Sequence, residues 1–211
     1  MIPAAFDYAK AESVDHAIEL LGGAGDAKVL AGGHSLLPLM KTRLAQPSLL
    51  VDIGRIGDLS YIREEDDVIA IGALVRHHDV ANSELLQRAA PIVADTAEQI
   101  GDPQVRHVGT IGGSIAHADP AGDMGTVMLA LGASFVIRGT GGASRTVAAG
   151  DFFKGLFHAD LAANEVLTEI RVPKTTGVSP MFVRATVAEP LRCTAATPTI
   201  AQSIARRWNF R

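Results

Sequence analysis

The fold of this chain is decided by the stretch KVLAGGHSLLPLMKTRLAQPSLLVDI, residues 28–53. Lys28 to Ala31 is a short, mainly apolar run that predicts a strand. Leu36 to Arg43 has apolar residues at helical spacing, with Pro38 in the first turn, where proline fits a helix. A second compact apolar strand follows at Leu49 to Ile53. This order of strand, helix and strand predicts a small parallel sheet.

The segments that flank this stretch predict further helices and strands. Ser13 is a preferred N-cap residue and Gly22-Gly23 is a helix stop, so a short helix is expected between them. Tyr61 to Glu64 and Val68 to Gly72 predict a hairpin with its turn at Asp66-Asp67. The remaining predicted elements are helical segments from His77 to Ile100, a helix Met124 to Leu131, strands Ser134 to Arg138 and Ser144 to Ala148 joined by a turn at Gly139 to Ala143, and a strand Glu165 to Val172 with Val166, Thr168 and Ile170 on one face.

Length and composition exclude several classes of protein. The chain has 211 residues, 47% of them hydrophobic and 20% charged, which is enough apolar material for one large or two small globular domains. Its longest nearly apolar stretch, Thr126 to Ile137, is shorter than the roughly 20 residues that span a bilayer, so no membrane span is expected. The net charge of −4 provides no electrostatic footprint for nucleic acid, which we do not expect as a ligand.

The two ends of the chain support further expectations. The first residues, MIPAAFD, lack the basic and apolar regions of a secretion signal, and the single cysteine, Cys193, forms no disulfide within the chain, so we expect a cytoplasmic location. One cysteine is also too few for an iron–sulfur cluster, which must then belong to a partner. Residues 176–211 have five arginines and one acidic residue, and we expect a weakly structured tail or the altered remnant of something longer.

Two short glycine motifs share one pattern. Ala31-Gly32-Gly33-His34-Ser35 and Thr110-Ile111-Gly112-Gly113-Ser114 each have an apolar lead, two glycines and a serine. Paired glycines let backbone N–H groups turn towards an anion and the serine adds a hydroxyl, so together the motifs predict an anion cradle. Neither motif contains lysine or arginine, so a pyrophosphate there would be held by peptide dipoles and a helix N-terminus. The alternative is that each glycine pair only makes a tight turn.

The second motif lies in a glycine-rich stretch, residues 101–125, which has six glycines and no helical or alternating period. So long a loop in a compact domain is usually functional or disordered, and we expect the functional case because no charge run is present. Asp119 and Asp123 are expected to accept hydrogen bonds from the hydroxyls of a dinucleotide, because a carboxylate next to a phosphate is repelled. Helix capping by Asp123 is the alternative, and both roles are compatible.

These motifs also resemble those of a known family. AGGHSLLPLMKTRL, residues 31–44, and GDPQVRHVGTIGGSIAHADPAGDM, residues 101–124, are similar to the FAD-binding medium subunit of aerobic carbon monoxide dehydrogenase and its relatives in the xanthine dehydrogenase group. The resemblance includes NEVLTEIRVP, residues 164–173, and covers about residues 1–175. It is specific, because two long motifs and a shorter one occur in order.

The resemblance implies an α/β (α+β) architecture, the two-lobed FAD-binding fold of the vanillyl-alcohol-oxidase (PCMH) type, with FAD between the lobes. The implied FAD-binding subdomains are residues 1–55 and 56–175. The family's C-terminal domain is then largely missing, and residues 176–211 are its atypical remnant. No tyrosine follows Tyr61, so the family's flavin-stacking tyrosine has no counterpart.

The resemblance also implies cofactor-binding residues, and no catalytic residue or metal ligand. The two glycine motifs surround the pyrophosphate, Asp123 matches the family's aspartate, and the backbone near Leu167 lies by the isoalloxazine ring. Gly101 and Asp119 align with positions that line the same cleft. The full set of expected FAD-binding residues is Val29, Leu30, Ala31, Gly32, Gly33, His34, Ser35, Leu36, Gly101, Thr110, Ile111, Gly112, Gly113, Ser114, Asp119, Asp123 and Leu167.

By resemblance, the chain is expected to pass electrons from partner iron–sulfur clusters through FAD to an external acceptor. The expected partners are a molybdopterin-containing large subunit and a small subunit with two-iron two-sulfur clusters, assembled as a dimer of heterotrimers. The alternative, suggested by the missing third domain, is a non-catalytic truncated subunit that docks on its partners with weak or no flavin binding. A nicotinamide-linked reductase on the same fold ranks last, because no Rossmann fingerprint or Walker loop is present.

Overall fold

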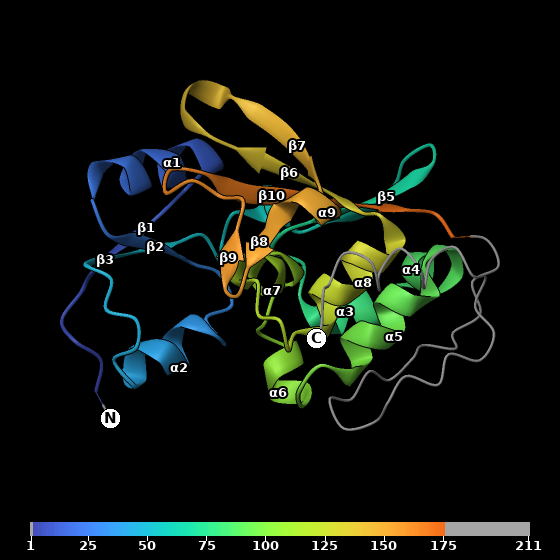
Figure 1. The fold of residues 1–211 in the computed structure, drawn as a ribbon, viewed down its shortest axis with the longest axis horizontal. Helices are drawn as coiled ribbons and strands as arrows, with labels where there is room; N and C mark the ends of the chain where they lie inside the picture. The colour runs from blue at the N-terminus through green and yellow to red at the C-terminus, as the bar shows by residue number, and fades with distance from the viewer. Residues whose placement is uncertain (1, 176–211) are drawn as a thin grey trace, which may run out of the picture. The chain divides into compact units, whose positions relative to one another are not determined.

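Two larger β-sheets and a two-stranded one, formed by β8 (Phe153–Gly155) and β9 (His158–Ala159), organise the chain in the computed structural model, which describes residues 2–175 (Figure 1). The first is a parallel sheet in the order β1–β3–β2, built from β1 (Asp7–Lys10), β2 (Ala27–Leu30) and β3 (Leu49–Asp52). The parallel pairing expected for β2 and β3 is confirmed. β1 has no counterpart among the predicted strands and joins the other side of β3. The tail, residues 176–211, lies outside the described range.

Two helices accompany the parallel sheet, both close to their predicted bounds. α1 (Val14–Gly23) is capped by Ser13, whose side chain accepts a hydrogen bond of 3.1 Å from the N–H of His16. α2 (Leu36–Lys41) follows the first glycine motif. It ends before Arg43, the predicted last residue, because Arg43 has a left-handed φ of 60° that no helix continues through.

The second sheet has five strands in the order β4–β5–β10–β6–β7, and all neighbours are antiparallel. Its strands are β4 (Ile62–Glu64), β5 (Val68–Gly72), β6 (Ser134–Arg138), β7 (Ser144–Ala148) and β10 (Val166–Pro173). The predicted hairpin of β4 and β5 and the predicted bounds of β6 and β7 are confirmed. The one-face alternation predicted for the last strand is wrong, because the register of β10 shifts at a bulge between Leu167 and Glu169 and all five residues 166–170 are buried.

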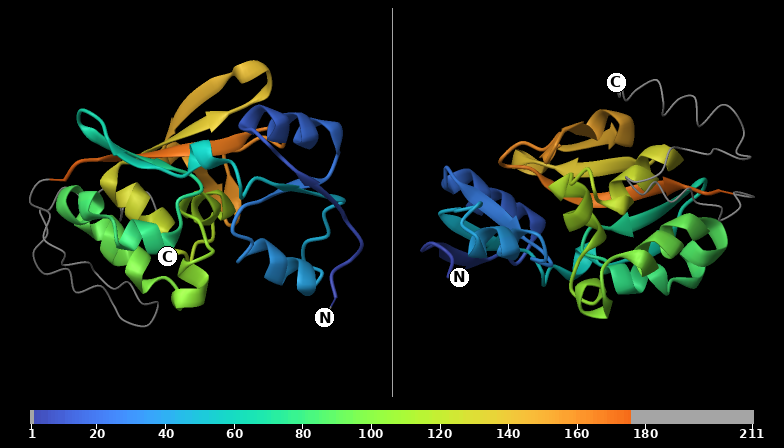
Figure 2. Two further views of the ribbon diagram at one scale, coloured as in Figure 1. Left: turned by 180° about the vertical axis from the view of Figure 1, so that it is seen from behind. Right: turned by 60° about the horizontal axis from the view of Figure 1, so that its bottom comes forward.

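Helices gather on one face of this second sheet (Figures 1 and 2). They are α3 (His77–Ala81), α4 (Glu84–Ala89), α5 (Pro91–Gln99) and α8 (Asp123–Leu131). With the strands they bury the larger apolar core, in which the rings of Phe135 and Phe152 meet edge to face at 4.6 Å. Both sheets belong to one compact unit, Met1–Thr176, and Arg138 of β6 forms an ion pair of 2.7 Å with Asp15 of α1.

The glycine-rich stretch, residues 101–125, is not the long loop that the sequence predicted. It contains α6 (Pro103–Arg106), α7 (Ile111–His117) and the start of α8. The side chains of Asp102 and Thr110 cap α6 and α7, since each accepts a hydrogen bond from a first-turn N–H. Caps and packing therefore make helices here in spite of the high glycine content.

Gly112 shows why α7 tolerates glycine. A Cβ added at Gly112 would lie 2.5 Å from the Cβ of Ala73, closer than two carbon atoms can approach. The second glycine motif is thus a place of close contact between a helix and the segment after β5. The remaining short elements are η1 (Gly57–Leu59), η2 (Thr140–Gly142), α9 (Ala149–Phe152), β8 (Phe153–Gly155) and β9 (His158–Ala159). Within residues 2–175, no helix has the length and apolar character needed to cross a membrane.

Candidate functional site

The parallel strands β2 and β3 end at the same edge of their sheet, and the loops that follow them lie side by side. Residues 31–35, the first glycine motif, follow β2, and residues 54–57 follow β3. The carbonyl oxygen of Ala31 lies 3.7 Å from the position of a Cβ added at Gly54. Crevices at the carboxyl ends of parallel strands are common ligand sites in α/β proteins, so we place the candidate site at this edge.

A cleft of about 180 Å³ opens at this edge. Its walls include Ala31, Gly32, Gly54, Arg55, Arg76 and Thr110. The fold therefore brings part of the first glycine motif together with the first residue of the second, although the two motifs are far apart in the sequence.

The first glycine motif presents a row of backbone N–H groups. Within residues 2–175, the N–H groups of residues 32–35 have no hydrogen-bond acceptor. Gly33 turns the chain with a φ of +74°, in the left-handed region that favours glycine. A Cβ added at Gly32 would lie 2.4 Å from the carbonyl oxygen of Val108, so glycine is required where the first motif approaches the segment just before the second. Such a row of unpartnered donors suits an anion.

The second glycine motif differs, because its N–H groups are already used by the protein. The donor–acceptor pairs are Ile111 N–H to Val75 O (2.9 Å), Gly112 N–H to Ala73 O (3.0 Å), Gly113 N–H to Thr110 Oγ1 (3.2 Å) and Ser114 N–H to Thr110 O (3.0 Å). The expectation that both motifs turn free N–H groups towards an anion is therefore wrong for the second motif. The physical reason is that α7 begins there, and a helix start satisfies its first donors by capping and packing.

Two arginines that the sequence analysis missed line the cleft. Arg55 follows β3, and Arg76 precedes α3 and donates a hydrogen bond to the carbonyl oxygen of His107. The sequence analysis expected peptide dipoles alone, because neither glycine motif contains lysine or arginine; the cleft adds two arginines from outside the motifs to its walls. The position of Arg55 just after a parallel strand is a signal that identifies it from sequence. Arg76 has no such signal in the sequence. It reaches the cleft because it forms an isolated antiparallel β-bridge with Thr110.

The other expected site residues lie outside the cleft walls. Val29 and Leu30 lie in β2, His34 and Ser35 are exposed, Leu36 begins α2, Gly113 is exposed, Gly101 precedes α6 with a φ of +49°, and Leu167 is buried in β10. The structure thus spreads the predicted set over several elements, and the cleft joins only its central members, Ala31, Gly32 and Thr110.

Asp119 and Asp123 lie beyond α7. Asp119 accepts a hydrogen bond of 2.9 Å from the N–H of Ala121 and so stabilises the turn before α8. The N-cap of α8 is Gly122, and Asp123 is the first helical residue, exposed and without a side-chain cap hydrogen bond. Capping by Asp123 is therefore wrong as an explanation, although its charge suits the positive end of the helix dipole.

His77 is buried and contacts the backbone just before the second glycine motif. Its backbone N–H donates to the carbonyl oxygen of Gly109 (3.1 Å), and the residue is 4% exposed. The ring Nδ1 has no hydrogen-bond partner within the described residues. Burial lowers the pKa of His77 to about 4, so the imidazole is neutral at physiological pH. Within residues 2–175, no three metal-ligating side chains gather around it or elsewhere.

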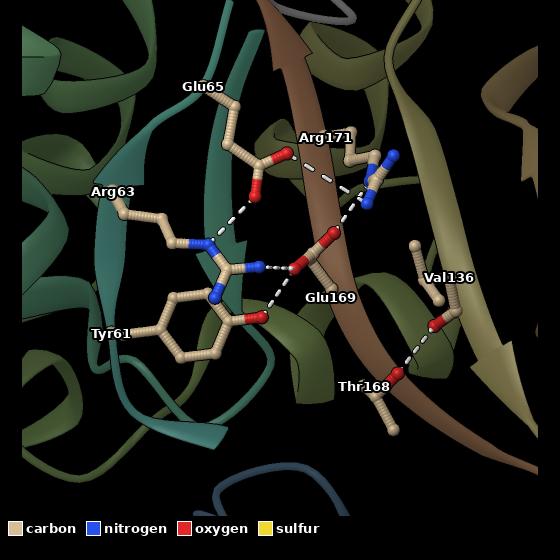
Figure 3. Close-up of polar contacts among 7 residues, drawn as sticks. All are labelled: Tyr61, Arg63, Glu65, Val136, Thr168, Glu169 and Arg171. Atoms are coloured by element: carbon tan, nitrogen blue, oxygen red, sulfur yellow. Dashed lines mark hydrogen bonds and ion pairs between the residues drawn. The ribbon is translucent and has the colours of Figure 1, made fainter. Parts of the chain in front are cut away.

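A cluster of charged residues also surrounds Glu169 on β10 (Figure 3). Glu169, 5% exposed, accepts hydrogen bonds from Tyr61 (2.5 Å), Arg63 (3.0 Å) and Arg171 (2.6 Å). Burial raises the pKa of Glu169, but the hydrogen bonds from Tyr61 and Arg171, together with the charges of Arg171 and Arg63, hold the pKa below its ordinary value. Since protein donors satisfy this carboxylate, we interpret the cluster as an anchor of the β10 bulge.

The described region matches one protein family and several known proteins. The family model for the FAD binding domain in molybdopterin dehydrogenase matches residues 4–175. The carbon monoxide dehydrogenase medium chain of Hydrogenophaga pseudoflava is 50% identical over 174 residues, which cover 82% of this chain and 60% of that one. The glyceraldehyde dehydrogenase medium chain of Sulfolobus acidocaldarius is 40% identical over 182 residues, which cover 86% and 64%.

A solved structure gives the same result. Carbon monoxide dehydrogenase from Hydrogenophaga pseudoflava, in a form that lacks the Mo-pyranopterin moiety, superposes with a TM-score of 0.81 at 48% identity, over 83% of this chain and 61% of that one. The expected α/β fold is confirmed. The chain spans about 60% of the length of the curated medium chain from Hydrogenophaga that it matches.

Proposed function

This chain belongs to the family of the FAD binding domain in molybdopterin dehydrogenase, and from that premise we propose that it is the FAD-carrying, electron-transferring subunit of a molybdenum hydroxylase complex. In this role it passes electrons from iron–sulfur clusters of a partner through FAD to an external acceptor. When bound, FAD supplies the redox chemistry, and the chain binds and orients it.

One observation carries this proposal: the row of N–H groups at residues 32–35 has no acceptor within residues 2–175 and lies beside a cleft with two arginines. Four successive donors and two cations fit the diphosphate of a dinucleotide, whose oxygens accept hydrogen bonds and carry negative charge. Residues 29–36 would hold the diphosphate on one side, with Thr110 on the other. If the glycine pairs only made tight turns, with every N–H group bonded to the protein and no cation nearby, the site would not fit a diphosphate.

The remaining expected residues are proposed to bind the rest of the cofactor. Asp119 and Asp123 would accept hydrogen bonds from ribose or ribityl hydroxyls, because both carboxylates lie away from the cleft that would take the diphosphate. Gly101, the rest of the second motif (Ile111, Gly112, Gly113 and Ser114) and the backbone near Leu167 complete the proposed set. The proposed FAD-binding subdomains are residues 1–55 and 56–175.

We propose that the partners are a molybdopterin-containing large subunit and a small subunit with two-iron two-sulfur clusters, in a cytoplasmic dimer of heterotrimers. The relatives named above are medium chains of a carbon monoxide and a glyceraldehyde dehydrogenase. Since this chain is similar to medium chains of dehydrogenases with different substrates, we assign the choice of substrate to the large subunit.

A visible absorption spectrum of the purified chain, followed by acid release and chromatography of the bound compound, tests this function. We expect flavin absorption and close to one released FAD per chain. Gly32→Ala should lose the flavin, because its Cβ would lie 2.4 Å from the carbonyl oxygen of Val108. Gly25→Ala is the matched control, since no atom lies within 4 Å of a Cβ added at Gly25.

A colourless chain that stays colourless with added FAD, also in the presence of its partner subunits, would contradict the proposal. That result would favour the alternative of a subunit that docks on its partners with weak or no flavin binding. Retention of full flavin by Gly32→Ala would instead contradict the assignment of the first glycine motif.

A further inference from the structure

We propose that Arg55 and Arg76 are the cationic partners of the cofactor's diphosphate, one supplied by each sheet. This inference rests on the proposed function, because it assumes that the chain binds FAD. Arg55 follows β3 of the parallel sheet, and Arg76 follows β5 of the antiparallel sheet. Both line the cleft that also includes Gly32 of the first glycine motif.

The charges of both arginines are available within the described part of the chain. The arginines that form ion pairs there are Arg63, Arg88, Arg138, Arg145 and Arg171. Neither Arg55 nor Arg76 pairs with a carboxylate among residues 2–175. Asp52, at the end of β3, is already engaged, because it accepts hydrogen bonds from the N–H of Gly54 (2.8 Å) and from the hydroxyl of Tyr8.

Arg76 is also oriented. One of its guanidinium nitrogens donates to the carbonyl oxygen of His107, which leaves the other N–H groups of the fork for a ligand. A guanidinium held in this way loses less side-chain entropy when it binds an oxyanion.

The size of the cleft indicates which part of a ligand it receives. Its volume of about 180 Å³ is below the roughly 300–1,000 Å³ of sites that enclose a whole drug-sized ligand. The compact and charged part of a dinucleotide is its diphosphate, and guanidinium forks match phosphate oxygens well. Two arginines and Gly32 in the cleft walls, continued by the free N–H groups of residues 33–35, therefore suit a diphosphate better than an aromatic ring.

Equilibrium titration of the full chain with FAD and with riboflavin, followed by flavin fluorescence, tests this assignment. Arg55→Gln and Arg76→Gln should each weaken FAD binding about tenfold, the effect of one lost charge-assisted hydrogen bond. Riboflavin has no phosphate, so its affinity should stay unchanged in both variants. The conservative variants Arg55→Lys and Arg76→Lys should recover part of the FAD affinity, and added salt should weaken FAD binding more in the wild type than in the Gln variants.

The matched control is Arg43→Gln, at the exposed end of α2 and outside the cleft walls, which should bind FAD like the wild type. FAD affinities that stay unchanged in both cleft variants would overturn this inference and leave the proposed function intact. Equal losses for FAD and riboflavin, together with a lower unfolding temperature, would also overturn it, because the arginines would then only support the fold. A wild-type chain that binds no FAD would overturn the proposed function and this inference with it.

Discussion

The two glycine motifs have the same sequence pattern and different structural roles. In residues 31–35 the glycines leave a strand at an open sheet edge, and the N–H groups of residues 32–35 have no acceptor within the described chain. In residues 110–114 the same pattern begins a helix, and all four following N–H groups bond to the protein. The paired-glycine pattern therefore identifies places where another group lies close to the backbone. Whether a ligand or the protein itself makes that approach depends on the tertiary surroundings.

The largest expected effect comes from adding a side chain at Gly112, where α7 packs closely against Ala73. Gly112→Ala should lower the free energy of unfolding by about 4 kcal/mol, from overpacking and from the lost hydrogen bond between Gly112 N–H and Ala73 O. Chemical denaturation measures this loss. Gly22→Ala is the matched control in α1, where an added Cβ meets no atom within 4 Å, so this change should stabilise the chain slightly. If both variants changed the free energy of unfolding by similar amounts, Gly112 would have no special packing role, and the contrast between the two motifs would fail.

The next effect is a pH dependence that belongs to the second motif. His77 donates a hydrogen bond to Gly109, the residue just before that motif, and burial lowers the pKa of His77 from 6.5 to about 4. As the pH falls, the imidazole of His77 is therefore protonated at a higher pH in the unfolded chain than in the folded chain. The free energy of unfolding should be highest above pH 6.5, fall by about 3 kcal/mol as the pH drops from 6.5 towards 4, and level off below.

Denaturation curves across this pH range for wild type and His77→Gln measure the contribution, and the variant should show a flatter profile. His34→Gln changes an exposed histidine in the first motif and should keep the wild-type profile. A wild-type profile in His77→Gln would contradict the assignment to the buried imidazole.

The smallest expected effects separate the two hydroxyl residues of the motifs. Thr110→Ala should cost about 1 kcal/mol of unfolding free energy, because Thr110 Oγ1 caps α7. Ser35 makes no side-chain cap hydrogen bond, so Ser35→Ala should leave stability unchanged and weaken FAD binding about fivefold through the lost hydroxyl donor. Thermal unfolding and FAD titration of both variants measure the two effects. A loss of stability in Ser35→Ala and a loss of FAD affinity alone in Thr110→Ala would show that the roles of the two motifs are reversed.

Local signals in the sequence are sufficient for most elements of the fold. The Ser13 cap and the glycine stop predict α1. The apolar run in β6 and the glycine turn that follows it predict β6 and β7 with their observed bounds. These signals succeed because caps, turns and alternation act over a few residues.

The parts that sequence analysis missed depend on distant residues. The helix α7 contains two glycines and has weak intrinsic helix propensity, and packing on Ala73 decides its structure. The bulge in β10 follows from pairing with β6, which no local alternation reveals. In the candidate site, the glycine motif itself is visible in the sequence, whereas Arg76 reaches the cleft only through its bridge to Thr110.

Hydrogen–deuterium exchange of the backbone amides, with and without FAD, tests the central claim most directly. The amides of residues 32–35 should exchange rapidly in the FAD-free chain and become protected when FAD binds, because they then acquire acceptors. The amides of residues 111–114 should be protected in both states, since protein acceptors already hold them. FAD binding that protects residues 111–114 and leaves residues 32–35 unchanged would contradict the account.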